Sequence, residues 1–214
     1  MTVSENSVHR GFDAALTGSI TKLELTDGRT LRLSAQRWHD PADSADKWLL
    51  ERCHGATLDL GCGPGRLVEA LQAQGIPALG VDFSAVAVRH CLDRGAPAVH
   101  GDLFDSLPDE GNWRHVVLAD GNIGIGGDPV RLLRRALELV GSGGSVLVET
   151  ASAFPGLWRG GARLSGHRQT ADDGWFPWAV LGLDALPGLA HRAGLRVLDS
   201  HREPHRHFAR LEAL

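Results

Sequence analysis

Short apolar segments alternate with amphipathic segments between residues 56 and 150, and this alternation constrains the fold more than any other feature. The apolar segments, which have the length and composition of strands, are 56–60, 78–82, 97–102, 114–120 and 145–150. Gly75 ends the first intervening helix, and Ser84 caps the start of the second. The Asp128-Pro129 pair begins the third helix, and the glycine-rich segment 141–144 ends it. Strands joined through helices at this spacing predict an α/β fold, with a mainly parallel sheet covered by helices on both faces.

Residues 1–50 read as an N-terminal appendage to this core. Residues 19–34 form two short strands around Asp27-Gly28. A two-residue loop would split Leu23 and Leu25 from Leu31 and Leu33, whereas a three-residue loop over 26–28, with Gly28 left-handed, places all four leucines on one face. We therefore predict the three-residue loop.

A capped amphipathic helix is expected over 42–53, with Trp48, Leu49 and Cys53 on its buried side. Residues 151–180 have little periodicity and contain three of the six tryptophans. We predict that this segment is an irregular functional loop or lid. Residues 181–214 predict a helix ending at Gly194 and then two antiparallel strands, and the whole chain reads as a single domain.

Composition excludes several classes of protein. The 214 residues carry 22 basic and 26 acidic side chains, a net charge of −4, which argues against a nucleic-acid-binding face. The longest apolar runs are too short to cross a bilayer, and the first residues lack a signal-peptide pattern. Three cysteines cannot form a disulfide framework, so we expect a cytoplasmic protein with no membrane partner.

A glycine-rich loop between the first strand and the first helix of the core is the strongest candidate for a binding site. Its sequence, LDLGCGPGRL over 58–67, spaces the glycines as Gly61-x-Gly63-x-Gly65. Glycines allow the backbone to approach a ligand closely, and the loop lies at the carboxyl end of a parallel strand, where ligands of α/β sheets bind. Arg66 stands where the dinucleotide-binding pattern requires glycine.

Acidic residues fall at comparable positions on four strands. Asp59, Asp82, Asp102 and Asp120 all lie at or near the strand ends, so we expect them to converge at one edge of the sheet. The carboxylate of Asp82 can accept two hydrogen bonds from a ribose diol. Asp102, at the end of the next strand, would then lie within reach of an adenine amino group.

These residues resemble those of the class I S-adenosylmethionine-dependent methyltransferases. The resemblance covers residues 45–150 and rests on five motifs in order: LDLGCGPGRL, VDFS, GDLFDSLP, HVVLADGNIGIGGDP and VGSGGSVLVE. It implies a three-layer Rossmann-like fold whose seven-stranded sheet has an antiparallel last strand. It also implies S-adenosylmethionine as the cofactor and S-adenosylhomocysteine as its product.

The resemblance further implies a set of cofactor-binding residues. The glycine loop would cradle the methionine part, Asp82 would hold the ribose, and Phe83 would pack on the adenine. The full set is Asp59, Gly61, Cys62, Gly63, Pro64, Gly65, Asp82, Phe83, Ser84, Asp102, Leu103, Ala119, Asp120 and Gly121.

Candidates on the acceptor side are Trp38, Asn122, Trp175 and Trp178, with Asn122 and His39 as candidate catalytic residues. Each has an alternative role: the tryptophans could pack a loop onto the core, Asn122 could fill a left-handed turn position, and His39 could be a surface residue. No Asn-Pro-Pro-aromatic motif follows the fourth strand, which argues against the amino-methylating enzymes that act on nucleic acids and glutamine.

The histidines at 201, 205 and 207 could suggest a metal, but Pro204 interrupts them and no cysteine or acidic ligand accompanies them, so we predict no metal site. The predicted function is methyl transfer to a small-molecule O- or N-nucleophile, by a monomer or a homodimer. The alternatives are a non-methylating user of the same cofactor, a cofactor-binding module, and a nicotinamide-dependent oxidoreductase.

Overall fold

A seven-stranded sheet forms the centre of the molecule. The computed structural model describes residues 12–16, 20–166 and 174–214. The strand order is β10-β11-β7-β6-β3-β4-β5. The bounds are β3 (Thr57–Leu60), β4 (Ala78–Asp82), β5 (Ala98–His100), β6 (Trp113–Leu118), β7 (Val140–Thr150), β10 (Leu195–Arg202) and β11 (His207–Ala213). Neighbouring strands are parallel except that β11 runs antiparallel to β7 and β10, so the predicted sheet is confirmed.

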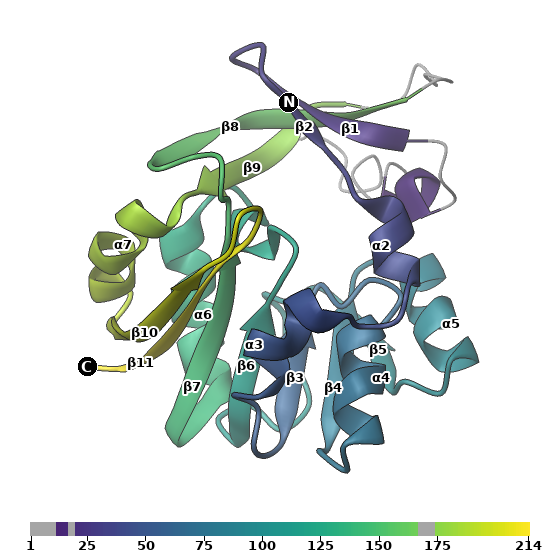
Figure 1. Ribbon diagram of the computed structural model, residues 1–214, viewed down its shortest axis with the longest axis vertical. Helices are drawn as coiled ribbons and strands as arrows, with labels where there is room; N and C mark the ends of the chain where they lie inside the picture. Colours follow the sequence, from purple (N-terminus) through teal and green to yellow (C-terminus); the bar gives the residue numbers. More distant parts are fainter. Residues whose placement is uncertain (1–11, 17–19, 167–173) are drawn as a thin grey trace.

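Helices cover both faces of this sheet, as predicted (Figure 1). Their bounds are α2 (Ala35–His39), α3 (Lys47–Leu50), α4 (Arg66–Ala73), α5 (Ala85–Asp93), α6 (Pro129–Leu139) and α7 (Leu186–Arg192), with short 3₁₀ turns η1 (Ser44–Asp46), η2 (Asn122–Gly124) and η3 (Leu183–Ala185). Alternate residues of β6 divide between the two layers. Val116 and Leu118 pack in the cluster that includes α6 and α7, and Val117 packs in the cluster that includes α3, α4 and α5.

The predicted helix boundaries are confirmed in the core. The Ser84 hydroxyl caps α5 by accepting from the N–H of Ala87, and Asp128 caps α6 ahead of Pro129. Gly75 ends the α4 region with a φ of +74°. The glycines at 141–144 behave differently from the prediction, because α6 ends at Leu139 and these glycines lie inside β7.

The helix predicted over 42–53 is shorter than expected. Asp43 caps η1 with a reciprocal capping box, and α3 continues it for only one turn. Trp48, Leu49 and Cys53 are nevertheless buried, as predicted.

A second, antiparallel sheet has the order β2-β1-β8-β9. Its strands are β1 (Ile20–Leu25), β2 (Thr30–Arg32), β8 (Leu157–Gly166) and β9 (Phe176–Leu181). Leu23 pairs with Leu31, and Gly28 has a φ of +87°, so the three-residue loop is confirmed.

The prediction of an irregular segment over 151–180 was wrong. Most of this segment consists of β8 and β9, although residues 167–173 lie outside the described part of the chain. The strand signal is weak because Gly160 and Gly161 interrupt the apolar alternation of β8. Its pairing partner, β1, is also distant in sequence. A side chain at Gly160 would clash with Trp158 and with Thr26 of the neighbouring hairpin.

The second sheet lies across the carboxyl ends of the parallel strands (Figure 1). Two isolated bridges join it to the main sheet region, one between Ala151 and Gly182 and one between Ile125 and Trp178. We call this four-stranded sheet the cover sheet. Within the described ranges, no helix has the length and apolarity needed to cross a membrane.

Candidate functional site

The glycine loop joins β3 to α4 with a backbone that only glycine adopts easily. Gly61, Gly63 and Gly65 have φ values of +73°, +53° and +84°. A Cβ at Gly65 would lie 2.7 Å from the Sγ of Cys91, which explains why this position must also be small. The N–H of Gly61 donates to the carbonyl oxygen of Val81 at 2.8 Å, so the loop is fixed to the end of β4.

Asp82 links this loop to the start of α5. Its carboxylate accepts from the N–H of Gly63 and from the N–H of Ser84, each at 2.8 Å. Burial raises the pKa of Asp82, and the two backbone hydrogen bonds oppose this effect. The hydroxyl of Ser84 also donates to Asp13, which places the short helix over 12–16 beside the same carboxylate.

The remaining predicted nucleoside-side residues lie around the ends of β4 and β5. Phe83 is 39% exposed, and its ring contacts the His100 ring edge-on at 5.8 Å. The Oδ1 atom of Asp102 accepts from the N–H of Phe104, and Leu103 is buried. Gly101 donates its N–H to the backbone oxygen of Asp82, so Asp102 and Asp82 belong to the same edge of the sheet.

Asp59 lies beneath the loop and is almost fully buried. Burial raises the pKa of Asp59 to about 7; nearby Arg66 lowers it, while Asp120, Asp82 and Asp46 raise it further. Asp59 is thus near enough to Asp120 and Asp82 for their charges to act on its carboxylate, and Asp102, the fourth predicted acid, is placed at this edge through the bond of Gly101 to Asp82.

Asp120 follows β6 in a left-handed conformation, with a φ of +52°. Its N–H donates to the Oε2 of Glu149 at 2.8 Å, and Gly121 next to it has a φ of +87°. The neighbouring Ala119 is buried. The strand end is therefore turned sharply at the position where the resemblance expects backbone to face the methyl group.

A buried network of charges supports this strand end, and no local sequence pattern predicted it. Arg66 pairs with Asp120 at 2.6 Å and with Asp46 at closer range. Arg206 pairs with Glu149 at 2.6 Å and with Asp46 at 2.8 Å. Despite its burial, Asp46 has its pKa lowered to about 2, because Arg66 and Arg206 contact it.

Little in the sequence indicates that the residues of this charge network lie together. Arg66 occupies the position where a dinucleotide-binding loop has glycine, and Asp43 and Asp46 have capping-box spacing. Neither observation indicates that the side chains are buried together.

Asn122 connects the end of β6 to the glycine loop. Its Nδ2 atom donates to the carbonyl oxygens of Leu60 and Gly61 at 2.9 and 2.7 Å. The alternative prediction that Asn122 fills a left-handed position was wrong, because Asp120 and Gly121 take that conformation instead.

The candidate acceptor-side tryptophans do not form one wall. Trp178 lies on the inner side of β9, with its ring centroid 6.0 Å from that of Phe12, and it contacts Gly124 of η2. Trp175 is 40% exposed and lies against Arg163 on the outer side of the cover sheet, in a groove of about 450 Å³. Of the two, Trp178 is therefore the one that lies at the end of β6.

Trp38 and His39 lie on α2. Trp38 packs in the apolar cluster under the cover sheet. The Nε2 atom of His39 lies 2.7 Å from the carbonyl oxygen of Leu16, and its ring meets the His90 ring edge-on at 5.2 Å. His39 is thus placed against α5.

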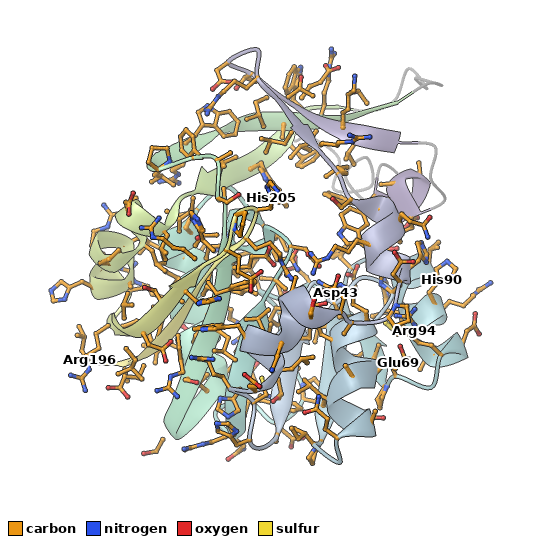
Figure 2. The ribbon with its side chains drawn as sticks, in the orientation of Figure 1. Asp43, Glu69, His90, Arg94, Arg196 and His205 are labelled. Atoms are coloured by element: carbon orange, nitrogen blue, oxygen red, sulfur yellow. The ribbon has the colours of Figure 1, made fainter. Side chains whose placement is uncertain are left out.

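The histidines near the C-terminus are separated by their packing. His201 stacks on Trp48 at 6.2 Å, whereas His205 projects from the β10–β11 turn toward the cover sheet (Figure 2). Among the described residues, no three or more His, Cys, Asp or Glu side chains are placed together so that they could hold a metal ion.

The shape of the site fits a zwitterionic thioether nucleoside. Among described atoms, none lies within 4 Å of a Cβ built at Gly63 or at Gly121, so backbone faces open space in the glycine loop and in the turn after β6. The carboxylates of Asp82 and Asp120 lie at the same edge of the sheet, and carboxylates accept hydrogen bonds from hydroxyl and ammonium groups. This donor and acceptor set is suited to such a cofactor.

Comparison with curated proteins finds two relatives of the same type. The ubiquinone biosynthesis O-methyltransferase of Sodalis glossinidius is 28% identical over 131 residues, covering 52% of this chain and 49% of that protein. The enzyme of the same description from Pseudomonas syringae pv. tomato is 30% identical over 129 residues, covering 55% and 54%. The chain spans about half the length of these relatives.

Solved structures share the fold. A methyltransferase from Bacteroides fragilis, in complex with S-adenosylhomocysteine, has a TM-score of 0.76 at 17% identity and covers 100% of this chain and 97% of its own. The O-methyltransferase NcsB1 from neocarzinostatin biosynthesis, in complex with S-adenosylhomocysteine and a dihydroxynaphthoic acid, has a TM-score of 0.55 at 28% identity and covers 77% and 50%. A family model described as a methyltransferase domain matches residues 34–200. Since this match spans well over half of the chain, the protein belongs to the methyltransferase-domain family.

Proposed function

We propose that this protein transfers the methyl group of S-adenosylmethionine to a small-molecule acceptor through an oxygen or nitrogen nucleophile. The observation that carries the proposal is the Asp82 carboxylate, held by the N–H of Gly63 beside a glycine loop that opens to free space. This arrangement offers a carboxylate to ribose hydroxyls and bare backbone to the chain attached to the nucleoside.

Each end of the proposed site has its own residues. Asp82 would bind the ribose, and Phe83 would pack on the adenine. Gly61 and Gly63 would contact the methionine part, and Asp120 would lie on the side of the methyl group. The sulfonium of the cofactor supplies an already activated methyl group, so the main task left to the protein is alignment of the acceptor.

The proposed acceptor site lies between the end of β6 and the cover sheet. Trp178 rests on Gly124 there, and the inner face of the cover sheet is apolar, with Leu23, Leu25 and Leu164 buried. A compact, partly apolar acceptor with one nucleophilic group suits this setting. The O-methyltransferase relatives and the naphthoic acid bound to NcsB1 favour an oxygen nucleophile.

We propose that both sheets act together as one methyltransferase domain, as a monomer or a homodimer, in the cytoplasm. The net charge of −4 and the three cysteines, all free and buried, support a small-molecule acceptor over nucleic acid and a reducing location.

Calorimetric titration tests the cofactor assignment without knowledge of the acceptor. We expect S-adenosylmethionine and S-adenosylhomocysteine to bind and NADH to give no heat. Heat with NADH alone would favour the oxidoreductase alternative. Release of S-adenosylhomocysteine in the presence of a panel of small phenols and amines would then test turnover.

A further inference from the structure

Two of the three cysteines lie in contact beside the glycine loop. The Sγ atom of Cys62, in the loop, is 3.7 Å from the Sγ atom of Cys91, in α5. Both thiols are free, and both side chains are buried. The third cysteine, Cys53, donates instead to the carbonyl oxygen of Leu49 at 3.4 Å. The chain therefore contains one pair of thiols that are each other's neighbours.

Two glycines leave the space that this pair of sulfur atoms occupies. A Cβ at Gly80 in β4 would lie 2.5 Å from the Sγ of Cys62, and a Cβ at Gly65 would lie 2.7 Å from the Sγ of Cys91. A larger residue at either position would force the sulfur atoms to move. The close approach of the two thiols thus depends on the packing around them.

Both thiols also contact Gly63, the residue whose N–H holds Asp82. The Sγ of Cys91 donates to the carbonyl oxygen of Gly63 at 3.0 Å, and the Sγ of Cys62 lies 3.6 Å from the same oxygen. The N–H of Gly63 donates to the carboxylate of Asp82 at 2.8 Å. A chemical change at the two sulfur atoms therefore acts directly on the backbone of the glycine loop.

A disulfide at this position would displace that backbone. The two sulfur atoms would have to approach from 3.7 Å to about 2.05 Å, the length of the bond. Oxidation would also remove the S–H group of Cys91, so the carbonyl oxygen of Gly63 would lose this donor.

We propose that Cys62 and Cys91 form a reversible disulfide when hydrogen peroxide oxidises the protein, and that this disulfide weakens cofactor binding by displacing Gly63. The first part of the inference stands on the two sulfur atoms alone. The second part rests on the proposed function, because it requires a cofactor that binds at the glycine loop.

The reaction consumes one molecule of peroxide. Cys62 is 8% exposed and Cys91 is fully buried, so Cys62 reacts first. Its sulfur attacks one peroxide oxygen: an S–O bond forms, the O–O bond breaks, and a sulfenic acid and a water molecule result. The sulfur of Cys91 then attacks the sulfur of Cys62: the S–S bond forms, the S–O bond breaks, and hydroxide leaves with the thiol proton as a second water molecule. The two thiols thus supply the two electrons that reduce the peroxide.

The environment of Cys62 sets the conditions for this reaction. The hydrogen bond with Cys91, together with burial, raises the pKa of the Cys62 thiol. Because the thiolate is the reactive form, the disulfide should accumulate slowly, and millimolar peroxide is needed to form it.

Thiol counting and calorimetry test the two parts separately. After treatment with hydrogen peroxide, the denatured protein should retain one of its three free thiols, and peptide mapping should join Cys62 to Cys91. Affinity for S-adenosylhomocysteine should fall about 10-fold or more, the range for loss of a hydrogen bond to a charged group. Dithiothreitol should restore both the thiols and the affinity.

Two serine variants are the controls. Cys91→Ser keeps a donor for Gly63 but has no second thiol, so peroxide should leave Cys62 as a sulfenic acid that dimedone labels. Cys53→Ser removes the cysteine outside the pair and should form the disulfide and lose affinity as the wild type does. If Cys91→Ser does not fold, Cys53→Ser and the peptide map of the wild type still decide the matter.

Three results would overturn the inference. Peroxide-treated protein that retains all three thiols, or whose disulfide includes Cys53, would contradict the first part. A disulfide between Cys62 and Cys91 that leaves the affinity for S-adenosylhomocysteine unchanged would contradict the second part. Reduced protein that does not bind S-adenosylhomocysteine would contradict the proposed function, and with it the second part, whereas the disulfide would still be tested by thiol counting.

Discussion

The Nδ2 atom of Asn122 lies 2.7 Å from the carbonyl oxygen of Gly61, so the turn after β6 is bonded directly to the glycine loop after β3. A Cβ at residue 61 would lie 2.7 Å from the same Nδ2 atom. Gly61 is therefore needed for its left-handed backbone and for the room that it leaves to Asn122. One amide holds two neighbouring strand ends at the spacing that the site requires.

Asn122→Ala should lower the free energy of unfolding by about 1–3 kcal/mol, because two part-buried carbonyl oxygens lose their donor. Asn122→Asp should cost more, since a carboxylate would then face those oxygens. Urea unfolding measures both effects. Asn112→Ala is the control, because Asn112 makes a comparable but exposed contact with the backbone of Glu110, and it should change stability by less than about 0.5 kcal/mol. A fully stable Asn122→Asp protein would contradict this role.

Asp82→Ala should abolish detectable binding of S-adenosylhomocysteine, because it removes the proposed ribose acceptor and the partner of the Gly63 N–H. Asp82→Asn keeps one carbonyl oxygen and should bind measurably but weakly. Calorimetry distinguishes these outcomes, with Asp93→Ala on the exposed end of α5 as a control that should bind like the wild type. Unchanged affinity in Asp82→Ala would refute the ribose assignment.

His115 should make stability depend on pH. It is buried, with Nδ1 at 2.9 Å from the Oγ of Ser145, and burial, aided by nearby Arg114, lowers its pKa from 6.5 to about 4. Between these values the unfolded chain binds a proton that the folded protein does not. Stability should therefore fall as the pH drops from 6.5 toward 4, by about 2 kcal/mol between pH 7 and pH 5.

A difference measurement isolates this effect from that of Asp59. The raised pKa of Asp59, about 7 against an ordinary 3.8, acts in the opposite direction: it favours folding at low pH, and this stabilisation is lost as the pH rises toward 7. Comparing the wild type with His115→Gln at pH 7 and pH 5 removes the Asp59 contribution. If the two proteins lose stability in parallel, His115 is not the responsible group.

Gly124→Ala should separate the cover sheet from the end of β6. A Cβ there would lie 2.2 Å from the carbonyl oxygen of Ala179 and 2.8 Å from the ring of Trp178, so β9 would have to move. We expect a loss of about 2 kcal/mol or more, together with a change in tryptophan fluorescence. Gly188→Ala in α7 is the matched control: nothing in the described structure lies within 4 Å of its Cβ position, and the change should stabilise the helix slightly. Equal effects of the two changes would show that Trp178 does not rest on Gly124.

The main sheet was predictable because its signals are local. Ser84 and Asp128 cap their helices through contacts with residues two or three positions along the chain, and the end of β4 at Asp82 follows from the length of the apolar run. The register of the first hairpin was also predictable, since only one loop length places Leu23 and Leu31 on the same face.

The cover sheet and the charge network were not predictable because both are formed by residues that lie far apart in the sequence. Lys22 pairs with Ser165, and no local pattern reports such a pairing. Arg66 and Asp46 are charged residues that usually lie on a surface, and only the folded chain shows that they neutralise each other inside. Trp175 and Trp178 could not be distinguished in the sequence. In the structure, Trp175 precedes β9 and Trp178 lies within it, and the alternation of side chains places them on opposite faces of the cover sheet.

The pairing of β1 with β8 sets an order of assembly. During synthesis, β1 leaves the ribosome long before β8 exists, whereas β3, β4, β5, β6 and β7 are all made between them. The parallel strands and their helices can thus begin to pack while the β1–β2 hairpin still lacks its pairing strand, β8. The strands β10 and β11, which complete the main sheet, are made after β8 and β9, so a nascent chain passes through a stage in which the glycine loop has left the ribosome while both sheets are still incomplete.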